Sequence, residues 1–419
     1  MKTLKSARFL TRIRNSASVL FSTVILLLTI LQSSAVAAHC PFCDAPTLMM
    51  AEQIQQCDHL LLGRWVSGVK PTATEAGSSV YEVKGVGRSS GDAFAVGQQI
   101  QMPFYIAGTE EKLYAIMGPG TQLLEWHAPL EVTDAGWKYL SELPPPVTEP
   151  AAQTERLIYA MNHLEHPDQM VANDAYAEFA AAPYEVIVPL RDRLPREKLL
   201  NWLMDPNTAV TRIGLYGLLI GLCGTDAEAS AIEQKIVVLD KDFRNGIDGV
   251  MSGYLLIRGE AGLQVIDDSK LRATTCRNAA GEEVKLPFSE TYAAMQALRF
   301  MWTYEPDRIP KDRLKVSMRL LLERPELTDL VIADLTRWKD WDIQDRLMQM
   351  YDEEKFNVPA IKRAVVRYLH YCSLDKAPAA TEGAPGEPTE AAVRAAANLK
   401  LLEEKDPRTV NDAKRYLIR

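Results

Sequence analysis

Two cysteines three residues apart, Cys40 and Cys43, are the residues whose types and spacing most directly suggest chemistry. A C-x-x-C pair can form a redox-active dithiol, supply half of a metal site or close a disulfide bond. The choice depends on the compartment and on the structural elements that flank the pair.

The segment before the pair has the layout of a secretory signal. Five basic residues and no acidic one precede an apolar run over 19–31, and the sequence AVA at 35–37 has the pattern of a signal-peptidase site. We therefore expect a signal peptide over 1–37 and an exported mature chain, periplasmic or extracellular, that begins at Ala38. The alternative is an uncleaved signal anchor, which would be the contact of the chain with the membrane.

Three interpretations of the pair remain at this position. Pro41 makes it similar to the glutaredoxin-type C-P-x-C motif, whose low thiol pKa depends on a helix N-terminus placed after a strand, and no strand can precede it here. A zinc site could draw on His39, Cys40, Cys43 and either Cys57 or His59, although C-x-x-C sites normally contain a second close pair. An oxidising compartment favours a structural disulfide among the three cysteines, which would fasten the N-terminus of the first domain. We accordingly expect no cofactor.

Composition and charge limit the expected partners. The chain has 419 residues, of which 47% are hydrophobic and 24% charged, enough for two or three folded domains. Its net charge is −8, and loss of the five basic residues in 1–37 would bring it to −13. An acidic chain without a basic stripe is repelled by nucleic acid and by anionic lipid. A protein or another envelope component is the expected partner.

Residues 38–141 are expected to form a small β domain. Between 59 and 132, five short segments rich in β-branched and aromatic residues are separated by glycine-containing turns. A helix is predicted before them in TLMMAEQIQQ, and another after them with Thr133 as its cap. Five strands in this length suggest a closed barrel, because closure removes exposed sheet edges.

Cysteines near the mature N-terminus, a helix, CDHLLLGRWVSG, VYEVKGVGRSSGD and LYAIMG together resemble the netrin-like modules of tissue inhibitors of metalloproteinases, over about residues 40–140. The resemblance implies an OB-type five-stranded barrel. That family ties its N-terminal cysteines to cysteines farther along the barrel, whereas no cysteine lies between Cys57 and Cys223 here. We therefore do not transfer to this chain the inhibition of metalloproteinases through the N-terminus, which the resemblance would otherwise imply.

A stiff linker with three consecutive prolines is expected over 142–155. Beyond it, over 156–375, apolar residues recur three and four apart, as in amphipathic helices. HPDQMVANDAYAEFA aligns with DPNTAVTRIGLYGLL at a period of about 39 residues, and FRNGIDGVMSGYLL follows after a similar interval. This pattern resembles HEAT repeats over about 155–374, which implies an α-solenoid. A flexible linker over 376–390 and a C-terminal helix over 391–419 complete a multi-domain α+β protein.

Several segments together look like one family of uncharacterised exported bacterial proteins with the same two-part layout: CPFC, NDAYAEFA, RIGLYGLLIGLCG, FSETYAAMQALRFMWTY and RWKDW. That resemblance implies no activity. No nucleophile elbow, phosphate-binding loop, zinc-protease motif or dinucleotide fingerprint occurs, and we assign no catalytic residue.

A small barrel joined to an acidic solenoid offers an extended surface, which favours a binding or scaffolding role. Within RWKDWDIQDR, the interaction candidates are Trp338, Lys339, Asp340 and Trp341, because tryptophan and arginine dominate interface energies. The alternative for both indoles is packing between repeats. Two other functions stay open: thiol–disulfide or metal handling through the C-x-x-C pair, and an enzyme with a site between barrel and solenoid.

Overall fold

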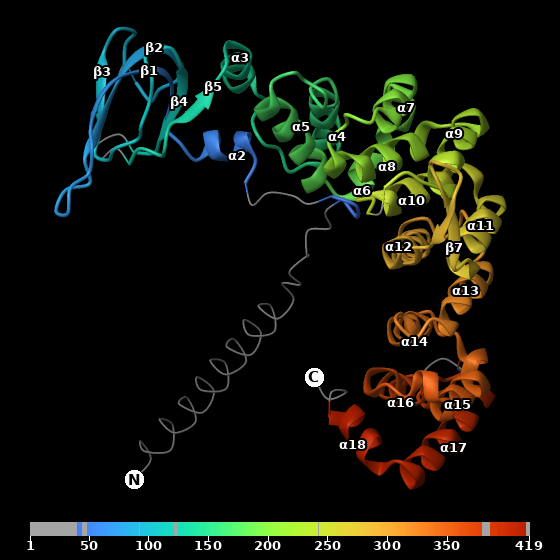
Figure 1. Cartoon of the computed structure of the whole chain (residues 1–419). Helices are drawn as coiled ribbons and strands as arrows, with labels where there is room; N and C mark the ends of the chain where they lie inside the picture. Colours follow the sequence, from blue (N-terminus) through green and yellow to red (C-terminus); the bar gives the residue numbers. More distant parts are fainter. Residues whose placement is uncertain are drawn as a thin grey trace, which may run out of the picture. The chain divides into compact units, whose positions relative to one another are not determined.

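A computed structural model describes residues 40–43, 48–91, 93–120, 125–241, 243–378 and 386–415 (Figure 1). The protein is mixed α+β: an antiparallel sheet comes first and helices follow it. The expected signal peptide and His39 lie outside the described residues. Among the helices that are described, none combines the length and the apolar character needed to cross a membrane.

The sheet contains five antiparallel strands in the order β3-β2-β1-β4-β5. They are β1 (His59–Val69), β2 (Ser78–Arg88), β3 (Gln99–Met102), β4 (Leu113–Gly118) and β5 (Leu130–Val132). Alternation along β2 places Tyr81 and Val83 in the core, with Glu82 between them more exposed. The five predicted strand segments are therefore confirmed.

The sheet is open, which corrects the expectation of a closed barrel. Closure would require β3 to pair with β5, but these edge strands have four and three residues and pair with β2 and β4 respectively. Helices α2 (Met50–Gln55) and α3 (Asp134–Glu142) instead pack against one face of the sheet. The two helices thus bury the apolar face of the sheet, so the strands need not close into a barrel to bury it.

Both predicted helices next to the sheet are present. Thr133 caps α3 as expected, accepting a hydrogen bond from the Gly136 N–H at 3.0 Å. Asp174 in α5 (Gln169–Ala181) connects these helices to the rest of the chain, because it accepts hydrogen bonds from the Met50 N–H at 2.9 Å and the Tyr139 hydroxyl at 2.8 Å.

The proline-rich segment is shorter than expected and is anchored. Helix α4 (Pro150–Met161) begins inside the predicted linker, with proline at its start, where a missing N–H does no harm. The buried Arg156 guanidinium donates to the carbonyls of Pro144 and Pro145 and, from Nε at 2.8 Å, to the Glu178 carboxylate. The prolines are therefore held against α4.

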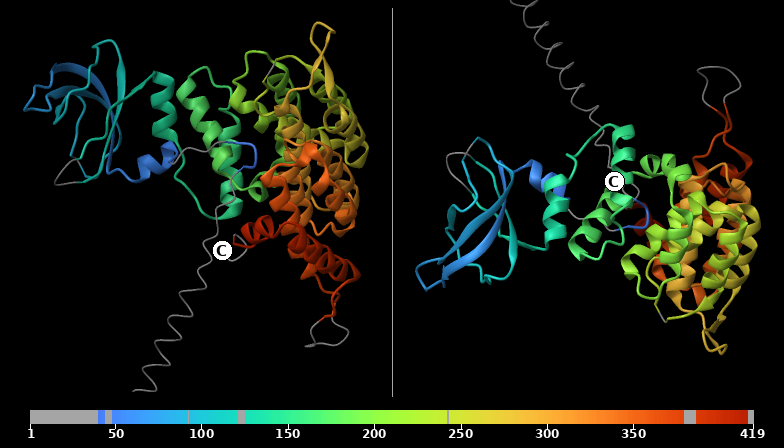
Figure 2. Two further views of the ribbon diagram at one scale, coloured as in Figure 1. Left: turned by 60° about the horizontal axis from the view of Figure 1, so that its bottom comes forward. Right: turned by 90° about the horizontal axis from the view of Figure 1, so that it is seen from above.

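From α4 onward, successive helices pack against one another, as Figures 1 and 2 show from three directions. The segments aligned at a period near 39 residues fall on α5, α8 and α10. The longer helices after α5 are α7 (Arg196–Met204), α8 (Ile213–Cys223), α9 (Asp226–Val237), α10 (Ile247–Arg258), α11 (Glu260–Ile266), α12 (Phe288–Tyr304), α13 (Lys311–Arg319), α14 (Thr328–Arg337), α15 (Gln344–Asp352), α16 (Pro359–Ser373), α17 (Glu390–Lys405) and α18 (Pro407–Arg415).

Helices α8 and α10 approach each other closely because glycines line their contact. A Cβ atom on Gly253 of α10 would collide with the carbonyl oxygen of Gly217, and one on Gly221 would collide with the Cα atom of Gly253. This pair is therefore built on backbone-to-backbone packing, which only residues without a side chain permit.

Two features of the helical region differ from expectation. A small sheet of β6 (Val238–Leu239), β7 (Thr275–Asn278) and β8 (Glu283–Lys285) lies where no strands are predicted. The predicted C-terminal helix is divided into α17 and α18, because Pro407 cannot continue a helix and instead begins the next one.

Candidate functional site

The C-x-x-C pair lies against helices and not against the sheet. Cys40 and Cys43 are at disulfide distance, with Cα atoms 5.4 Å apart. The Cys40 N–H donates to the carbonyl of Ala180 in α5 at 3.2 Å, and the Phe42 ring lies 5.0 Å from that of Phe300 in α12. These contacts place the loop on the helical region, which corrects its expected position on the barrel; its role as a covalent fastener stays a prediction.

Cys57 is a free thiol in the core between α2, α3 and the sheet, so the alternative bond to Cys57 is not formed. Burial raises the pKa of this thiol, and its sulfur lies 3.8 Å from Nδ1 of His127. Within the described ranges, no three His, Cys, Asp or Glu side chains are grouped to hold a metal ion. His39, the remaining member of the expected zinc set, lies outside those ranges.

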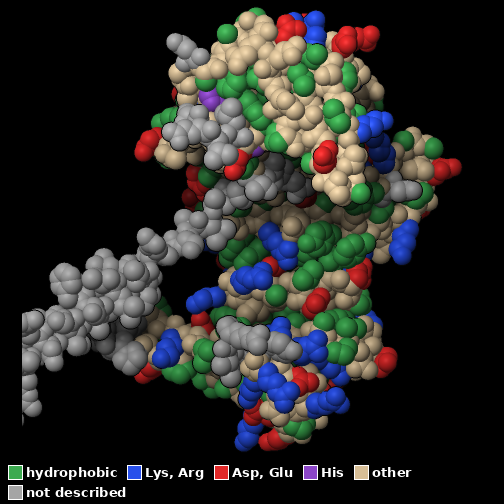
Figure 3. Space-filling model, turned by 90° about the vertical axis from the view of Figure 1, so that its left-hand side faces the viewer, with side chains coloured by type: hydrophobic (Ala, Val, Ile, Leu, Met, Phe, Trp, Pro, Cys, Tyr) green, Lys and Arg blue, Asp and Glu red, His purple; other side chains and the backbone are tan. Residues whose placement is uncertain are grey.

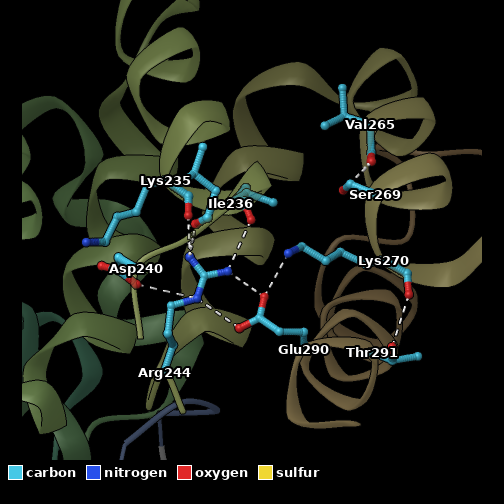
Figure 4. Close-up of polar contacts among 10 residues, drawn as sticks. Lys235, Ile236, Asp240, Arg244, Val265, Ser269, Lys270, Glu290 and Thr291 are labelled. Atoms are coloured by element: carbon cyan, nitrogen blue, oxygen red, sulfur yellow. Dashed lines mark hydrogen bonds and ion pairs between the residues drawn. The ribbon is translucent and has the colours of Figure 1, made fainter. Parts of the chain in front are cut away.

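A charged cluster occupies the core of the helical region (Figure 4). Arg244 and Lys270 point toward Glu290 from different elements, with Lys270 Nζ at 2.8 Å and Arg244 Nε at 2.9 Å from its oxygens. Burial favours the neutral acid, but hydrogen bonds from Arg244 and the two positive charges keep the pKa of Glu290 below its usual value. Burial lowers the pKa of Lys270. Lys270 and Glu290 are 0% and 1% exposed, so the cluster is structural.

A cavity of about 850 Å³ lies between α14 and α16. Each helix contributes one face, at the three- and four-residue spacing that brings side chains onto one side of a helix. The face of α14 consists of Asp329, Leu330, Ala333, Thr336 and Arg337, and that of α16 of Ala360, Arg363, Ala364, Arg367 and Tyr371. Lys339, Trp341, Leu374 and Asp375 complete the lining. We call this cavity the α14/α16 groove.

Small side chains alternate with larger apolar ones in the groove. Ala333, Ala360 and Ala364 leave room where longer side chains would fill the space between the helices. Around them, Leu330 is 38% exposed and Tyr371 48%. An exposed apolar lining of this kind is a typical property of a ligand or partner site.

The groove is also rich in positive charge, in contrast to the acidic chain as a whole. Its lining contains four cationic side chains, Arg337, Lys339, Arg363 and Arg367, against two carboxylates, Asp329 and Asp375. On the face seen in Figure 3, basic side chains lie among hydrophobic and acidic ones in the lower part, which the C-terminal helices form.

The salt bridges of the groove leave one arginine available. Lys339 Nζ lies 3.2 Å from Asp375, and Arg337 Nη1 lies 2.6 Å from the buried Asp334. Burial raises the pKa of Asp334, although Arg299 and Arg337 oppose this effect. Among the residues that the structure describes, Arg363 has neither a hydrogen-bond nor an ion-pair partner.

The four residues predicted from RWKDW divide into two pairs. Trp338 is 7% exposed and stacks on Trp302, and Asp340, 1% exposed, accepts a hydrogen bond from Arg319 Nε at 2.7 Å. These two are core residues. Lys339 and Trp341 line the groove, and the Trp341 ring meets that of Tyr368 edge-on at 5.3 Å.

The turn after α14 has an unusual backbone at Lys339. Its φ is 51°, the one positive φ of a non-glycine residue in the described part of the chain. The Asp340 N–H donates to the Leu335 carbonyl at 2.9 Å and the Lys339 N–H to that of Thr336 at 3.1 Å, which is the Schellman pattern of helix ends. Glycine normally occupies this left-handed position, because a side chain there costs about 1 kcal/mol.

No protein-family model, curated protein or solved structure matches the chain. The site therefore rests on the geometry of the groove.

Sequence reasoning missed the contribution of α16. Arg363, Arg367 and Tyr371 follow one another at intervals of four residues, so they share one side of the helix. This spacing was a usable signal, but the helical periodicity predicted over 156–375 explains the segment by packing alone. Only the position of α14 shows that this side of α16 is not covered by the core.

Proposed function

We propose that this protein is an exported binding or scaffolding protein that holds a protein partner in the α14/α16 groove. The observation that carries the proposal is the composition of the lining, in which three alanines leave space beside the exposed Leu330 and Tyr371 and beside basic side chains. Interfaces of this type combine an apolar centre with a polar rim.

The architecture is consistent with this role. We infer that the helix pairs from α4 onward form a HEAT-like array and that the N-terminal sheet is an opened relative of the netrin-like, OB-type module. In such arrays each repeat contacts its neighbours and leaves one face of the stack available for partners. Export through the signal over 1–37 would place the groove in the periplasm or outside the cell.

Site-specific photocrosslinking in the native host tests the proposal. A benzophenone amino acid replaces Tyr371 at the groove, and in a matched control it replaces Phe243, an aromatic residue that is 68% exposed and lies outside the groove lining. We expect a discrete protein adduct from position 371 and none from position 243. The adduct should disappear when Ala360→Leu fills the groove while the melting temperature is unchanged. Equal adducts from both positions, or an adduct that survives Ala360→Leu, would overturn the proposal.

A further inference from the structure

The groove has a direction that follows from its salt bridges. Lys339, just after the end of α14, contacts Asp375, just after the end of α16, so the C-terminal ends of both helices meet at one end of the groove. The basic side chains lie along the middle of α16 and at this end, in contrast to Asp329, which lies in the first turn of α14. A ligand that complements Arg363 in the middle of the groove and the exposed Lys339 at this end would carry negative charge at two places along its length.

The dimensions favour a short extended peptide. The lining of α16 and its following turn spans residues 360–374, which at 1.5 Å per residue is about 21 Å. An extended chain advances about 3.3 Å per residue, so about six residues would lie along the groove. The alanines leave space for an apolar side chain of such a peptide, and a small inorganic anion would leave that space unfilled.

Other anionic partners fit less well. The chain carries a net charge of −8, which repels nucleic acid and anionic membranes before the groove can be reached. A short acidic peptide segment meets only the local field of the groove, where the four cationic side chains outnumber the two carboxylates.

The backbone of Lys339 is a second, independent indication. A lysine is kept in a left-handed conformation that glycine would adopt without strain, at a position where its side chain is 73% exposed and lines the groove. Strain of this kind persists at sites where the side chain has a function. A positive charge therefore stands at this end of the groove on a backbone position that glycine would occupy without strain.

We propose that the α14/α16 groove binds an acidic peptide segment of about six residues, in which carboxylates pair with Arg363 and Lys339 and an apolar side chain lies over Ala333 and Ala360. This inference rests on the proposed function and adds the chemistry of the partner.

A display library of random peptides, selected on the immobilised full-length protein, tests both the proposed binding groove and the acidic chemistry of its partner. Sequences enriched by the wild type are compared with those enriched by Ala360→Leu, by Arg363→Gln, and by Arg408→Gln, which changes an exposed arginine of α18 outside the groove. We expect peptides with acidic residues around one apolar residue. Their affinity should fall about two- to fivefold in Arg363→Gln, should fall with rising salt, and should be unchanged in Arg408→Gln.

The outcomes distinguish a failure of the acidic-peptide inference from a failure of the proposed function of the groove. In one outcome the enriched peptides are neutral or basic, are lost from the Ala360→Leu selection and are unaffected by Arg363→Gln. That result would overturn the acidic-peptide inference and leave the proposed groove intact. Enrichment that is identical for wild type and Ala360→Leu, or no enrichment with any variant, would overturn the groove itself.

Discussion

The indole rings of Trp302 and Trp338 are stacked, with centroids 4.3 Å apart and 8° between the ring planes. The stack joins α12 to the end of α14, next to the turn that carries Lys339. It assigns Trp338 to the core, although its neighbour Trp341 belongs to the groove.

Removal of Trp338 should therefore reduce stability and not act on partner binding directly. Trp338→Ala leaves a cavity in the core, and we expect the free energy of unfolding to fall by about 3–5 kcal/mol. Denaturant unfolding followed by circular dichroism measures this change. As a comparison, Trp341→Ala removes a half-buried ring and should reduce stability less than Trp338→Ala. An unchanged unfolding midpoint in Trp338→Ala would contradict the core assignment.

Replacement of Lys339 by glycine should separate stability from binding. Lys339→Gly relieves a left-handed backbone that costs about 1 kcal/mol. It also removes the salt bridge to Asp375, in which the lysine side chain is 73% exposed, and such a pair is worth about 1 kcal/mol. We therefore expect equal or slightly higher thermal stability together with weaker binding of acidic peptides. Ala397→Gly, at an exposed position inside α17 and outside the groove lining, is the control and should lower stability by about 1 kcal/mol. A Lys339→Gly protein that is clearly less stable would refute the strain argument.

Loss of the central carboxylate in the buried cluster should be severe. Glu290→Gln leaves Lys270 in the core without a counter-charge and leaves Arg244 with only the more distant carboxylate of Asp240, 3.8 Å away; breaking a buried pair of this kind costs about 3–5 kcal/mol. Thermal or denaturant unfolding of the full-length protein gives the value. Glu282→Gln, at an exposed position between β7 and β8, is the matched control and should change stability by less than about 0.5 kcal/mol. Similar effects of the two substitutions would show that the cluster does not stabilise the core.

Stability should depend on acid pH through Asp168, the N-cap of α5. Partial burial acts to raise its pKa, but hydrogen bonds from the Thr133 hydroxyl and from the N–H groups of Val171 and Met170 lower that pKa below its usual value. Because the folded pKa lies below the unfolded one, the stabilisation by Asp168 is fully present above the unfolded pKa and is lost as the pH falls through the folded pKa.

Asp168→Asn keeps a capping side chain but removes this titration. We expect the wild type to be more stable than the variant by about 0.5 kcal/mol at neutral pH, the usual size of a charge interaction with a helix end, and the difference to vanish in acid. Urea unfolding over a pH series measures it. Glu149→Gln, at the N-cap of α4 where the side chain makes no capping bond, should show no such pH-dependent difference. A gap between wild type and Asp168→Asn that is constant down to acid pH would exclude the linkage.

Local chemistry makes much of this protein predictable from its sequence alone. The strand segments between 59 and 132, the helix capped by Thr133 and the predominance of helices in the part of the chain that follows are confirmed. Each depends on residues within a few positions of one another, through side-chain alternation, a capping hydroxyl or the three- and four-residue spacing of apolar residues.

Long-range packing decides the features that the sequence leaves open. Whether the sheet closes depends on β3 meeting β5, and the short lengths of both strands allow α2 and α3 to pack on one face instead. Whether Trp338 or Trp341 is available to a partner depends on residues far away in the sequence. Trp302, 36 positions before Trp338, stacks on it, and Trp338 is 7% exposed within the helical core. The groove itself exists only because α14 and α16 present their small side chains to each other, a relationship that no local pattern encodes.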